Sequence, residues 1–203
     1  MTDLATVLGR QQGRGVLGPD PAREQQAHSR GFAAALGRTP SRAVDLGSGG
    51  GVPGLVLAVE CWPEADVVLV DASQKRCTYL ELCVADLDLV GRVTVRWGRA
   101  EEVGRDPAHR GAHDAVVARS FGPPAAVAEC AAPLLAVGGH LVVSEPPEGP
   151  EGRWDDGALA ALGLVREGSE RIDGAWFTRL RQDAPCAERF PRRPGLPARR
   201  PLF

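Results

Sequence analysis

One segment specifies the architecture of this chain: Arg42-Ala-Val-Asp-Leu-Gly-Ser-Gly-Gly-Gly-Val-Pro-Gly54. It begins as a short, mainly apolar run, which predicts a buried β-strand. A glycine-dense turn follows, and Pro53 suits a helix start because its fixed φ matches the first helical turn. Glycine has no Cβ, so the backbone amides of such a turn can approach a ligand closely. The segment therefore predicts a strand, a ligand-binding turn and a helix in direct succession.

The glycine spacing is compatible with two classes of cofactor. A dinucleotide fingerprint fits Gly49-x-Gly51-x-x-Gly54, but this frame begins only after the strand has turned. The frame Asp45-x-Gly47-x-Gly49-x-Gly51 instead places a carboxylate at the end of the strand. A carboxylate repels a pyrophosphate and attracts the sulfonium and amino groups of S-adenosylmethionine (AdoMet). We therefore favour an AdoMet site and keep a nicotinamide or flavin site as the alternative.

Strand-like and helix-like patterns alternate along the rest of the chain. Apolar runs predict further strands over 65–71, 92–97, 114–118 and 138–143. Helices are expected after Ser73, around Glu101-Glu102 and after Pro123-Pro124, and Asp173-Gly174 marks a hairpin between 164–167 and 175–181. This order predicts an α/β fold with a mostly parallel sheet and a terminal antiparallel hairpin. That is the Rossmann-like plan of class I AdoMet-dependent methyltransferases.

Composition divides the chain into three parts. Residues 1–40 are expected to form an amino-terminal helical cap, with a helix over about Ala22–Leu36, and residues 41–184 an AdoMet-binding methyltransferase domain. Residues 185–203 form a tail rich in proline and arginine, which we expect to pack on the domain. The net charge is only −2. This value averages over an uneven distribution, because positive charge concentrates in the tail. There a single acidic residue, Glu188, stands among the arginines Arg189, Arg192, Arg193, Arg199 and Arg200.

The cysteines and the hydropathy pattern argue against several classes of protein. The cysteines are odd in number and have no Cys-x-x-Cys spacing, which predicts buried thiols in a reducing cytoplasm and no metal site. No apolar run approaches the ~20 residues of a membrane span, and no signal-peptide pattern precedes the core. We expect a cytoplasmic monomer that uses neither a membrane nor a metal.

Ligands of such a sheet bind at the carboxyl ends of its strands, so the residues there are candidates. Gly47 and Gly49 would line the cofactor turn beside Asp45. Asp71 ends the second strand and can accept the ribose hydroxyls; the alternative role is helix capping, for which Ser73 is better placed. Ala100 and Glu101 follow the third strand and would lie along the adenine edge. Glu101 could alternatively serve only to stabilise a helix start.

Two arginines are candidates for substrate contact. Arg99 stands at a helix start, where a cation is mildly unfavourable, so it is a candidate for binding a phosphate or carboxylate. Arg119 follows the fourth strand, at the position that faces the methyl group in class I enzymes; a buried structural salt bridge is the alternative. An acceptor with a free lone pair, such as guanine N7, needs positioning and no general base. A site that contains an arginine and no evident general base fits that chemistry.

The chain resembles the ribosomal RNA small subunit methyltransferase G family, also called glucose-inhibited division protein B. The likeness runs from about Val44 to Val143 and recurs in the tail, on the glycine turn, Asp71-x-x-x-Lys75-Arg76, Arg99-Ala-Glu-Glu102 and Ala118-Arg119-Ser120. It implies an enzyme that methylates guanine N7 in 16S ribosomal RNA with AdoMet, acting on that RNA or the small ribosomal subunit. The cofactor contacts it implies are Gly47, Val52, Ala100, Glu101 and Arg119. The RNA contacts it implies are Arg99, Arg192, Arg193, Arg199 and Arg200.

The chain departs from the family pattern at two places. The amino terminus is shorter, and only His28 corresponds to the family's Arg-His-x-x-Asp-Ser signature. Past the fifth strand the chain has Ser144-Glu145 where the family tends to have a lysine. Replacing a cation by an anion near an RNA cleft predicts weaker attraction for phosphates.

These departures keep two other functions open. One is a small-molecule AdoMet-dependent methyltransferase, which a closed apolar pocket lined by residues 1–40 would support. The other is a non-catalytic protein that binds AdoMet or RNA.

Overall fold

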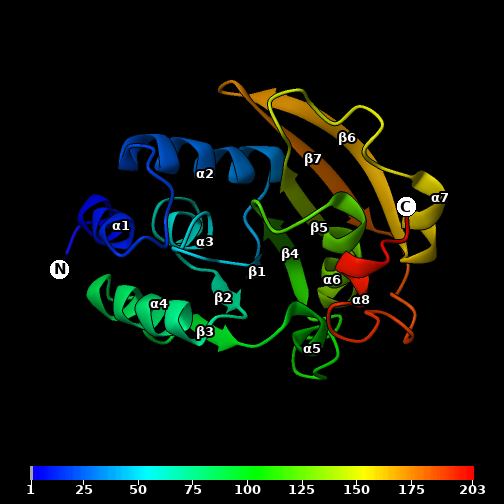
Figure 1. Cartoon of the computed structure of the whole chain (residues 1–203), viewed down its shortest axis with the longest axis horizontal. Coiled ribbons are helices and arrows are strands. Elements are labelled where there is room, and N and C mark those ends of the chain that lie inside the picture. The colour runs from blue at the N-terminus through cyan, green and yellow to red at the C-terminus, as the bar shows by residue number, and fades with distance from the viewer. Residues whose placement is uncertain (1) are drawn as a thin grey trace.

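A computed structural model describes residues 2–203, and it places a seven-stranded sheet at the centre of the molecule (Figure 1). The strands are β1 (Arg42–Leu46), β2 (Asp66–Asp71), β3 (Val93–Trp97), β4 (His113–Ala118), β5 (Leu135–Ser144), β6 (Leu164–Ile172) and β7 (Ala175–Gln182). The helices are α1 (Leu4–Gly13), α2 (Ala22–Leu36), α3 (Gly54–Val56), α4 (Gln74–Asp86), α5 (Ala100–Val103), α6 (Pro124–Ala131), α7 (Asp156–Ala161) and α8 (Leu196–Arg199). A π-helical turn, η1 (Leu57–Cys61), extends α3, and a 3-10 turn, η2 (Ala132–Leu134), extends α6.

The sheet order is β3-β2-β1-β4-β5-β7-β6. The first five strands run parallel, and β7 runs antiparallel to both β5 and β6. The strand order reverses between β1 and β4, so the carboxyl ends of these strands border the crevice in which such sheets bind ligands. This confirms the mostly parallel α/β fold with a terminal antiparallel hairpin.

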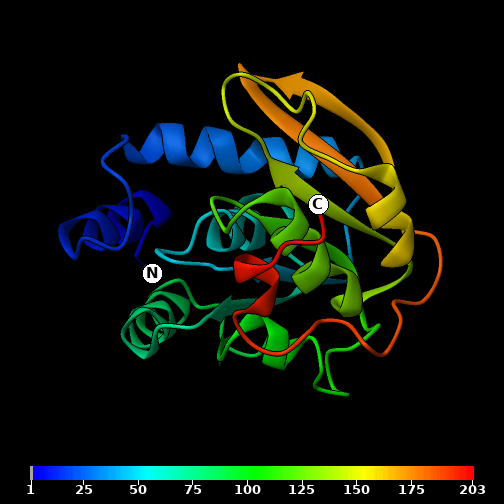
Figure 2. The same ribbon diagram turned by 45° about the vertical axis from the view of Figure 1, so that its right-hand side comes forward.

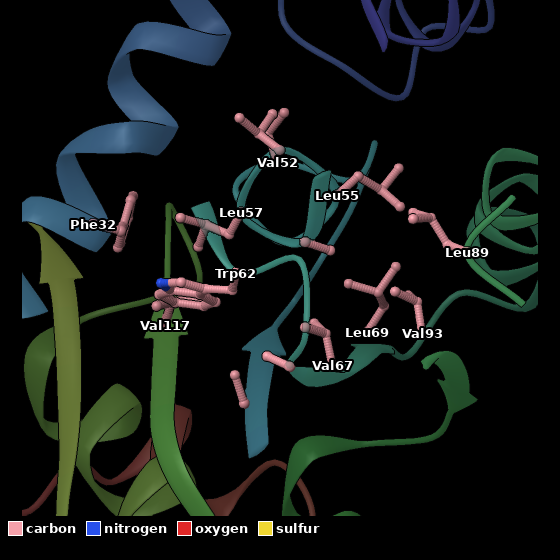
Figure 3. Close-up of a cluster of buried hydrophobic side chains, with 14 of the residues drawn as sticks. Phe32, Val52, Leu55, Leu57, Trp62, Val67, Leu69, Leu89, Val93 and Val117 are labelled. Carbon is pink, nitrogen blue, oxygen red and sulfur yellow. The ribbon is translucent and has the colours of Figure 1, made fainter. Parts of the chain in front are cut away.

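Alternate residues of the buried strands face opposite layers of the core, as the period of a strand requires. On one face, Ala43, Val67 and Val117 join a cluster with side chains of α1, α2, α3, η1 and α4. Figure 3 shows part of this cluster, with Trp62 and Leu57 packed between Phe32 of α2 and the strands. The other face is covered by α5, α6, α7 and part of the tail (Figure 2). Two helical layers therefore enclose the sheet.

The amino-terminal segment forms two helices, of which only α2 was predicted. The bounds of α2 match the expected Ala22–Leu36, because Pro21 precedes it and Gly37, at φ 70°, ends it. The helix α1 was not predicted; Asp3 caps it by accepting a hydrogen bond from the Thr6 amide at 3.0 Å. Together α1 and α2 lie over the same face of the sheet as α3 (Figure 1).

The terminal hairpin is longer than its sequence pattern predicted. Its turn residues Asp173 and Gly174 both have positive φ, 47° and 85°, which is the backbone of a type I′ hairpin turn. The strand β6 extends to Ile172 rather than ending at Glu167, because the polar residues beyond Glu167 still pair with β7. The hairpin carries Phe177, which packs edge-on against Phe32 of α2 at 5.0 Å between ring centres.

The tail packs on the domain through buried polar contacts. The Arg192 guanidinium pairs with Glu129 of α6, whose side chain is fully buried, at 2.6 Å between Nη2 and Oε2. Arg110 donates to the backbone carbonyls of Cys186, Ala187 and Phe190. The helix α8 consequently lies beside α6 and close to α5 (Figures 1 and 2).

Candidate active site

The glycine turn connects β1 to α3 at the carboxyl edge of the sheet. Gly47, Gly49 and Gly51 have φ values of 75°, 55° and 98°, a region that favours glycine. The Gly47 amide donates to the Val70 carbonyl at 2.9 Å, which fixes the turn against β2. A Cβ on Gly47 would lie 2.8 Å from the ring of Phe121. Glycine is therefore required at Gly47 both by its backbone and by the approach of this ring.

Asp45 lies beneath the turn with only 1% of its surface exposed. Its Oδ2 accepts a hydrogen bond from the Gly54 amide at 2.9 Å, and its Oδ1 has no hydrogen-bond partner within residues 2–203. Burial raises the pKa of Asp45 to about 7, because a charged carboxylate loses its hydration there. The residue thus anchors the turn and holds an acceptor atom that a nearby cation could stabilise.

Asp71 ends β2 and is bound by backbone amides on both oxygens. Its Oδ2 accepts from Gly49 at 2.9 Å, its Oδ1 accepts from Ser73 at 2.8 Å, and Arg76 lies 3.6 Å away. Ser73 caps α4, as expected, by accepting from the Arg76 amide at 3.4 Å. The Asp71 carboxylate is therefore held rigidly, and it forms part of a cavity wall.

That cavity, here called the inner cavity, has a volume of about 220 Å³ and lies at the ends of β1, β2 and β3. Gly47, Asp71, Ala100 and Glu101 line it, so four predicted cofactor residues meet at one place. The Glu101 carboxylate is buried, and its Oε1 accepts from the Gly195 amide of the tail at 2.7 Å. Its Oε2 lies 3.6 Å from Nε of Arg99.

Two further cavities adjoin the inner cavity. The turn cavity, of about 300 Å³, lies between the glycine turn and residues 16–20, and it includes the predicted cofactor residues Gly49 and Val52. The outer cavity, of about 450 Å³, lies at the ends of β4 and β5. Gly47 borders the inner and turn cavities, Phe121 borders the inner and outer cavities, and Arg119 borders the turn and outer cavities. The three cavities therefore surround one point at the end of β4.

Arg119 projects from that point toward α2. Its Nη1 donates to Oε1 of Gln25 at 2.5 Å, and among the described residues no carboxylate oxygen lies within ion-pair distance of it. A structural salt bridge, the alternative role, is therefore not what this side chain forms. Burial lowers the pKa of Arg119, since its charge is partly removed from water. Ser120 follows with φ 53°, a conformation rare outside glycine that is found at functional sites.

Glu145 does not carry its charge into the outer cavity as the sequence predicted. Its side chain is fully buried and accepts hydrogen bonds from Trp154 and Thr178, both at 2.6 Å. Arg153 pairs with it at 2.8 Å and itself lines the outer cavity. Arg153 therefore neutralises the added anion, and the weaker phosphate attraction expected from the missing lysine stays a prediction.

The predicted RNA-binding arginines differ in their surroundings. Arg99 is half-exposed, and Arg193, Arg199 and Arg200 are exposed. The Arg192 guanidinium instead pairs with Glu129 and donates a hydrogen bond to the Arg200 carbonyl at 2.8 Å. The charge available on the tail surface therefore comes mainly from its other arginines.

The structure also brings residues to the site that no local motif marked. Gln25 of α2 holds Arg119, Phe121 separates two cavities, and Pro197 and Ala198 of the tail line the inner cavity. Gln25, Pro197 and Ala198 are distant from Arg119 in sequence, so no local pattern could place them at the site. Phe121 lies only two residues after Arg119, and the neighbouring Pro-Pro pattern pointed to its segment.

The described part of the chain contains neither a metal-type cluster nor a helix that could span a membrane. Within residues 2–203, no three His, Cys, Asp or Glu side chains gather as a metal site would require. None of the described helices combines the length and apolarity needed to cross a bilayer. All five cysteines are free thiols; Cys77, Cys83 and Cys130 are buried, and Cys61 and Cys186 are half-buried.

Comparison with known proteins identifies the family of this chain. The family model described as rRNA small subunit methyltransferase G matches residues 32–145. The chain is 38% identical over 178 residues to ribosomal RNA small subunit methyltransferase G of Rubrobacter xylanophilus, covering 81% of this chain and 66% of that protein. It is 39% identical over 172 residues to the Prochlorococcus marinus (strain MIT 9313) protein of the same name, covering 80% and 68%. The chain thus spans about two thirds of the length of these curated relatives.

Solved structures support the same fold. Geranyl diphosphate C-methyltransferase from Streptomyces coelicolor A3(2), in complex with S-adenosyl-L-homocysteine, superimposes with a TM-score of 0.62 at 15% identity, over 80% of this chain and 82% of that one. At this identity the likeness concerns the fold alone. The sequence relationship goes further and confirms the resemblance deduced from the motifs: the chain belongs to the ribosomal RNA small subunit methyltransferase G family.

Proposed function

We propose that this chain transfers the methyl group of AdoMet to N7 of a guanine in 16S ribosomal RNA. The observation that carries the proposal is Arg119, a cation without a carboxylate partner in the described chain, where three cavities meet at the end of β4. Membership of the family supplies the substrate class, since its curated relatives are named for the small-subunit ribosomal RNA that they methylate.

The residues of the cavities fit AdoMet chemically. Asp71 and Glu101 offer buried carboxylates at the ends of β2 and β3, and the bare Cα of Gly47 leaves the turn open to a ligand. The unpartnered Oδ1 of Asp45 can be stabilised as an anion by the positive charge of the cofactor. When bound, AdoMet supplies an electrophilic methyl group on a sulfonium.

The chain's own residues would bind and orient the cofactor and shield its methyl group from water. Asp71 would accept hydrogen bonds from the ribose hydroxyls, and Ala100 and Glu101 would contact the adenine edge through a backbone amide and a carboxylate. Gly47, Gly49 and Val52 would hold the methionine portion at the glycine turn, with Asp45 beneath the turn. Phe121 borders both the inner and the outer cavity and would shield the space where they meet from water.

Transfer to N7 requires no proton acceptor, and the two ionisable candidates on the wall of the outer cavity, His28 and Glu145, are poorly suited to act as a base. His28 on its wall is a weak base, because burial, aided by the charge of Arg119, lowers its pKa to about 4. The carboxylate of Glu145 is already occupied by three donors. Guanine N7 presents a lone pair with no proton to lose, so Arg119 need only hold the base in line.

RNA would be held by the basic surface around the cavities. Arg99, Arg193, Arg199 and Arg200 are exposed or half-exposed and can contact phosphates, whereas Arg192 would contribute mainly by holding the tail. We propose that the protein works as a monomer in the cytoplasm on 16S RNA or the small ribosomal subunit. Residues 1–40 would act as a cap, 41–184 as the methyltransferase domain and 185–203 as the basic tail.

The surroundings of Arg119 do not favour a small-molecule acceptor. The spaces bordered by residues 1–40 are lined by charged and polar side chains, among them Asp20, Gln25 and Arg119, and they open to solvent. The closed apolar pocket that a small-molecule enzyme would use is not what α2 forms here.

The deciding experiment is transfer of a labelled methyl group from AdoMet to purified small subunits lacking N7-methylguanosine, followed by nucleoside analysis. Labelled N7-methylguanosine in 16S RNA is the expected product, and Arg119→Ala should abolish its formation while leaving the melting temperature close to that of the wild type. Binding of AdoMet without transfer to RNA would favour the small-molecule alternative, or the non-catalytic one if no acceptor is found. Full activity of Arg119→Ala would refute the role given to this residue.

A further inference from the structure

The carboxyl-terminal tail forms one wall of the inner cavity. Pro197 and Ala198 of α8 face Asp71, Ala100 and Glu101 across it. These two residues come from far along the chain, because the other lining residues belong to the glycine turn, the ends of β2 and β3, α5, and the segment that leads from Phe121 into α6. In Figure 2, α8 lies in front of the sheet, next to α6 and above α5.

The wall is attached directly to a residue of the cavity. The amide of Gly195 donates to Oε1 of Glu101 at 2.7 Å, and Glu101 is only 5% exposed. Gly195 itself has φ 78°, so the chain turns into α8 through a conformation that favours glycine. The contact between Gly195 and Glu101 thus fixes where Pro197 and Ala198 lie.

A second anchor holds the segment just before α8. Arg192 forms its bidentate pair with Glu129, and Glu129 lies on α6 beside Cys130, another residue that lines the inner cavity. Both anchors are carboxylates on the domain, Glu101 and Glu129, and both are buried. Both anchors precede α8, so the domain fixes the point at which this helix begins.

We propose that the tail segment 195–199 is part of the cofactor site and closes its adenine end, with Pro197 and Ala198 as the contacting residues. This inference rests on the proposed use of AdoMet and adds a binding element that comes from outside the glycine turn and the strand ends. An adenine ring in the inner cavity would be covered by these small side chains and removed from water. Removing the segment would expose the ring and speed release of the ligand.

Binding measurements test this without any RNA. The probes are S-adenosylhomocysteine and methylthioadenosine, of which the second retains the adenosine portion and lacks the amino-acid portion. A chain ending at Pro194 keeps the pair of Arg192 with Glu129 and loses α8. We expect its dissociation constants for both probes, measured by calorimetry, to rise at least tenfold, which corresponds to about 1.4 kcal/mol.

A point substitution tests the same idea in the full chain, with a matched control. Gly195→Ala and Gly174→Ala each place an alanine at positive φ, 78° and 85°, and neither added Cβ approaches another atom closely. The backbone penalty is thus similar, about five- to thirtyfold in the equilibrium of the turn concerned. Only Gly195 lies at the tail, so only Gly195→Ala should weaken binding of both probes, by up to that factor. It should also speed hydrogen exchange of the amides of 195–199.

The outcomes separate this proposal from the proposed function. Failure of the wild-type chain to bind either probe would overturn the AdoMet site itself. Wild-type affinity for methylthioadenosine in the chain ending at Pro194 would overturn the tail wall alone, as would equal affinities of Gly195→Ala and Gly174→Ala. Weaker binding by Gly195→Ala, with wild-type binding by Gly174→Ala, would support the tail wall.

Discussion

Replacing Arg192 by alanine should loosen the tail, because this residue holds a buried charge. The Glu129 side chain has no exposed surface and accepts from the Arg192 backbone amide at 2.8 Å and from its guanidinium at 2.6–3.1 Å. Arg192→Ala keeps the amide contact and removes every guanidinium donor. The carboxylate would then be buried with its charge largely uncompensated.

The expected loss of stability follows from that burial. Removing one partner of a buried ion pair costs about 3–5 kcal/mol. The Arg192 side chain is 25% exposed and the backbone donor remains, so the low end of that range, about 3 kcal/mol, applies. For a chain of this size that loss lowers the melting temperature by about 6–12 °C.

Urea and thermal unfolding of Arg192→Ala measure this loss, and Arg193→Ala is the matched control. Arg193 is the next residue, is exposed and forms no ion pair among residues 2–203. Its substitution should leave stability within about 0.5 kcal/mol of the wild type while weakening RNA binding. Equal stabilities of the two variants would refute the assignment of Arg192 as the tail anchor. An effect of Arg192→Ala on RNA affinity alone would restore it as a direct RNA contact.

Three further substitutions test the site. Gly47→Ala forces an alanine to φ 75° and a Cβ to 2.8 Å from Phe121, so calorimetry should find AdoMet binding at least tenfold weaker; unchanged affinity would contradict the need for glycine. The folded-state pKa of Asp45, about 7, lies above the unfolded value of ~4, so the folded chain retains a proton there and stability falls as pH rises from about 4 to 7. Asp45→Asn should therefore lose less stability than the wild type between pH 5 and pH 7.5 in urea titrations, and parallel losses would argue against a buried protonated acid. Arg99→Ala should weaken RNA binding and reduce the slope of log affinity against log salt by about 0.7–0.9, whereas an unaltered slope would remove Arg99 from the phosphate contacts.

The placement of most candidate cofactor residues at one edge of the sheet could be predicted from local sequence. Strand-ending residues of a parallel sheet meet at one edge, so Asp71, Glu101 and Arg119 could be assigned to a common site once their strands were recognised. The bounds of α2 followed from Pro21 and Gly37, which act only on their own neighbourhood. Predictions of this kind succeed because the period of the apolar residues and the geometry of a turn are properties of a few consecutive residues.

The remaining features depend on contacts between distant parts of the chain. Arg119 bonds to Gln25 rather than to a carboxylate, and Glu145 is neutralised by Arg153 rather than facing an RNA cleft. The helix α7 (Asp156–Ala161) was not predicted, because its apolar stripe is too short to show a period; Asp155 caps it. The partners of Arg119 and Glu145 depend on which residues lie opposite them in the folded chain, and the spacing of residues in the sequence does not show this.

The basic tail shows how the two kinds of information combine. Its proline and arginine pattern predicts a tail packed on the domain, whereas a free arm would lose conformational entropy, and with it affinity, when RNA ordered it. In the structure Arg192 faces inward to Glu129 while Arg193 is exposed. Of these two adjacent arginines, the first therefore anchors the tail and the second places its charge on the surface. The entropy of ordering residues 185–203 is therefore lost on folding rather than on RNA binding. A tail held this way can offer Arg199 and Arg200 to phosphates while Pro197 and Ala198, in the same turn of chain, line the inner cavity.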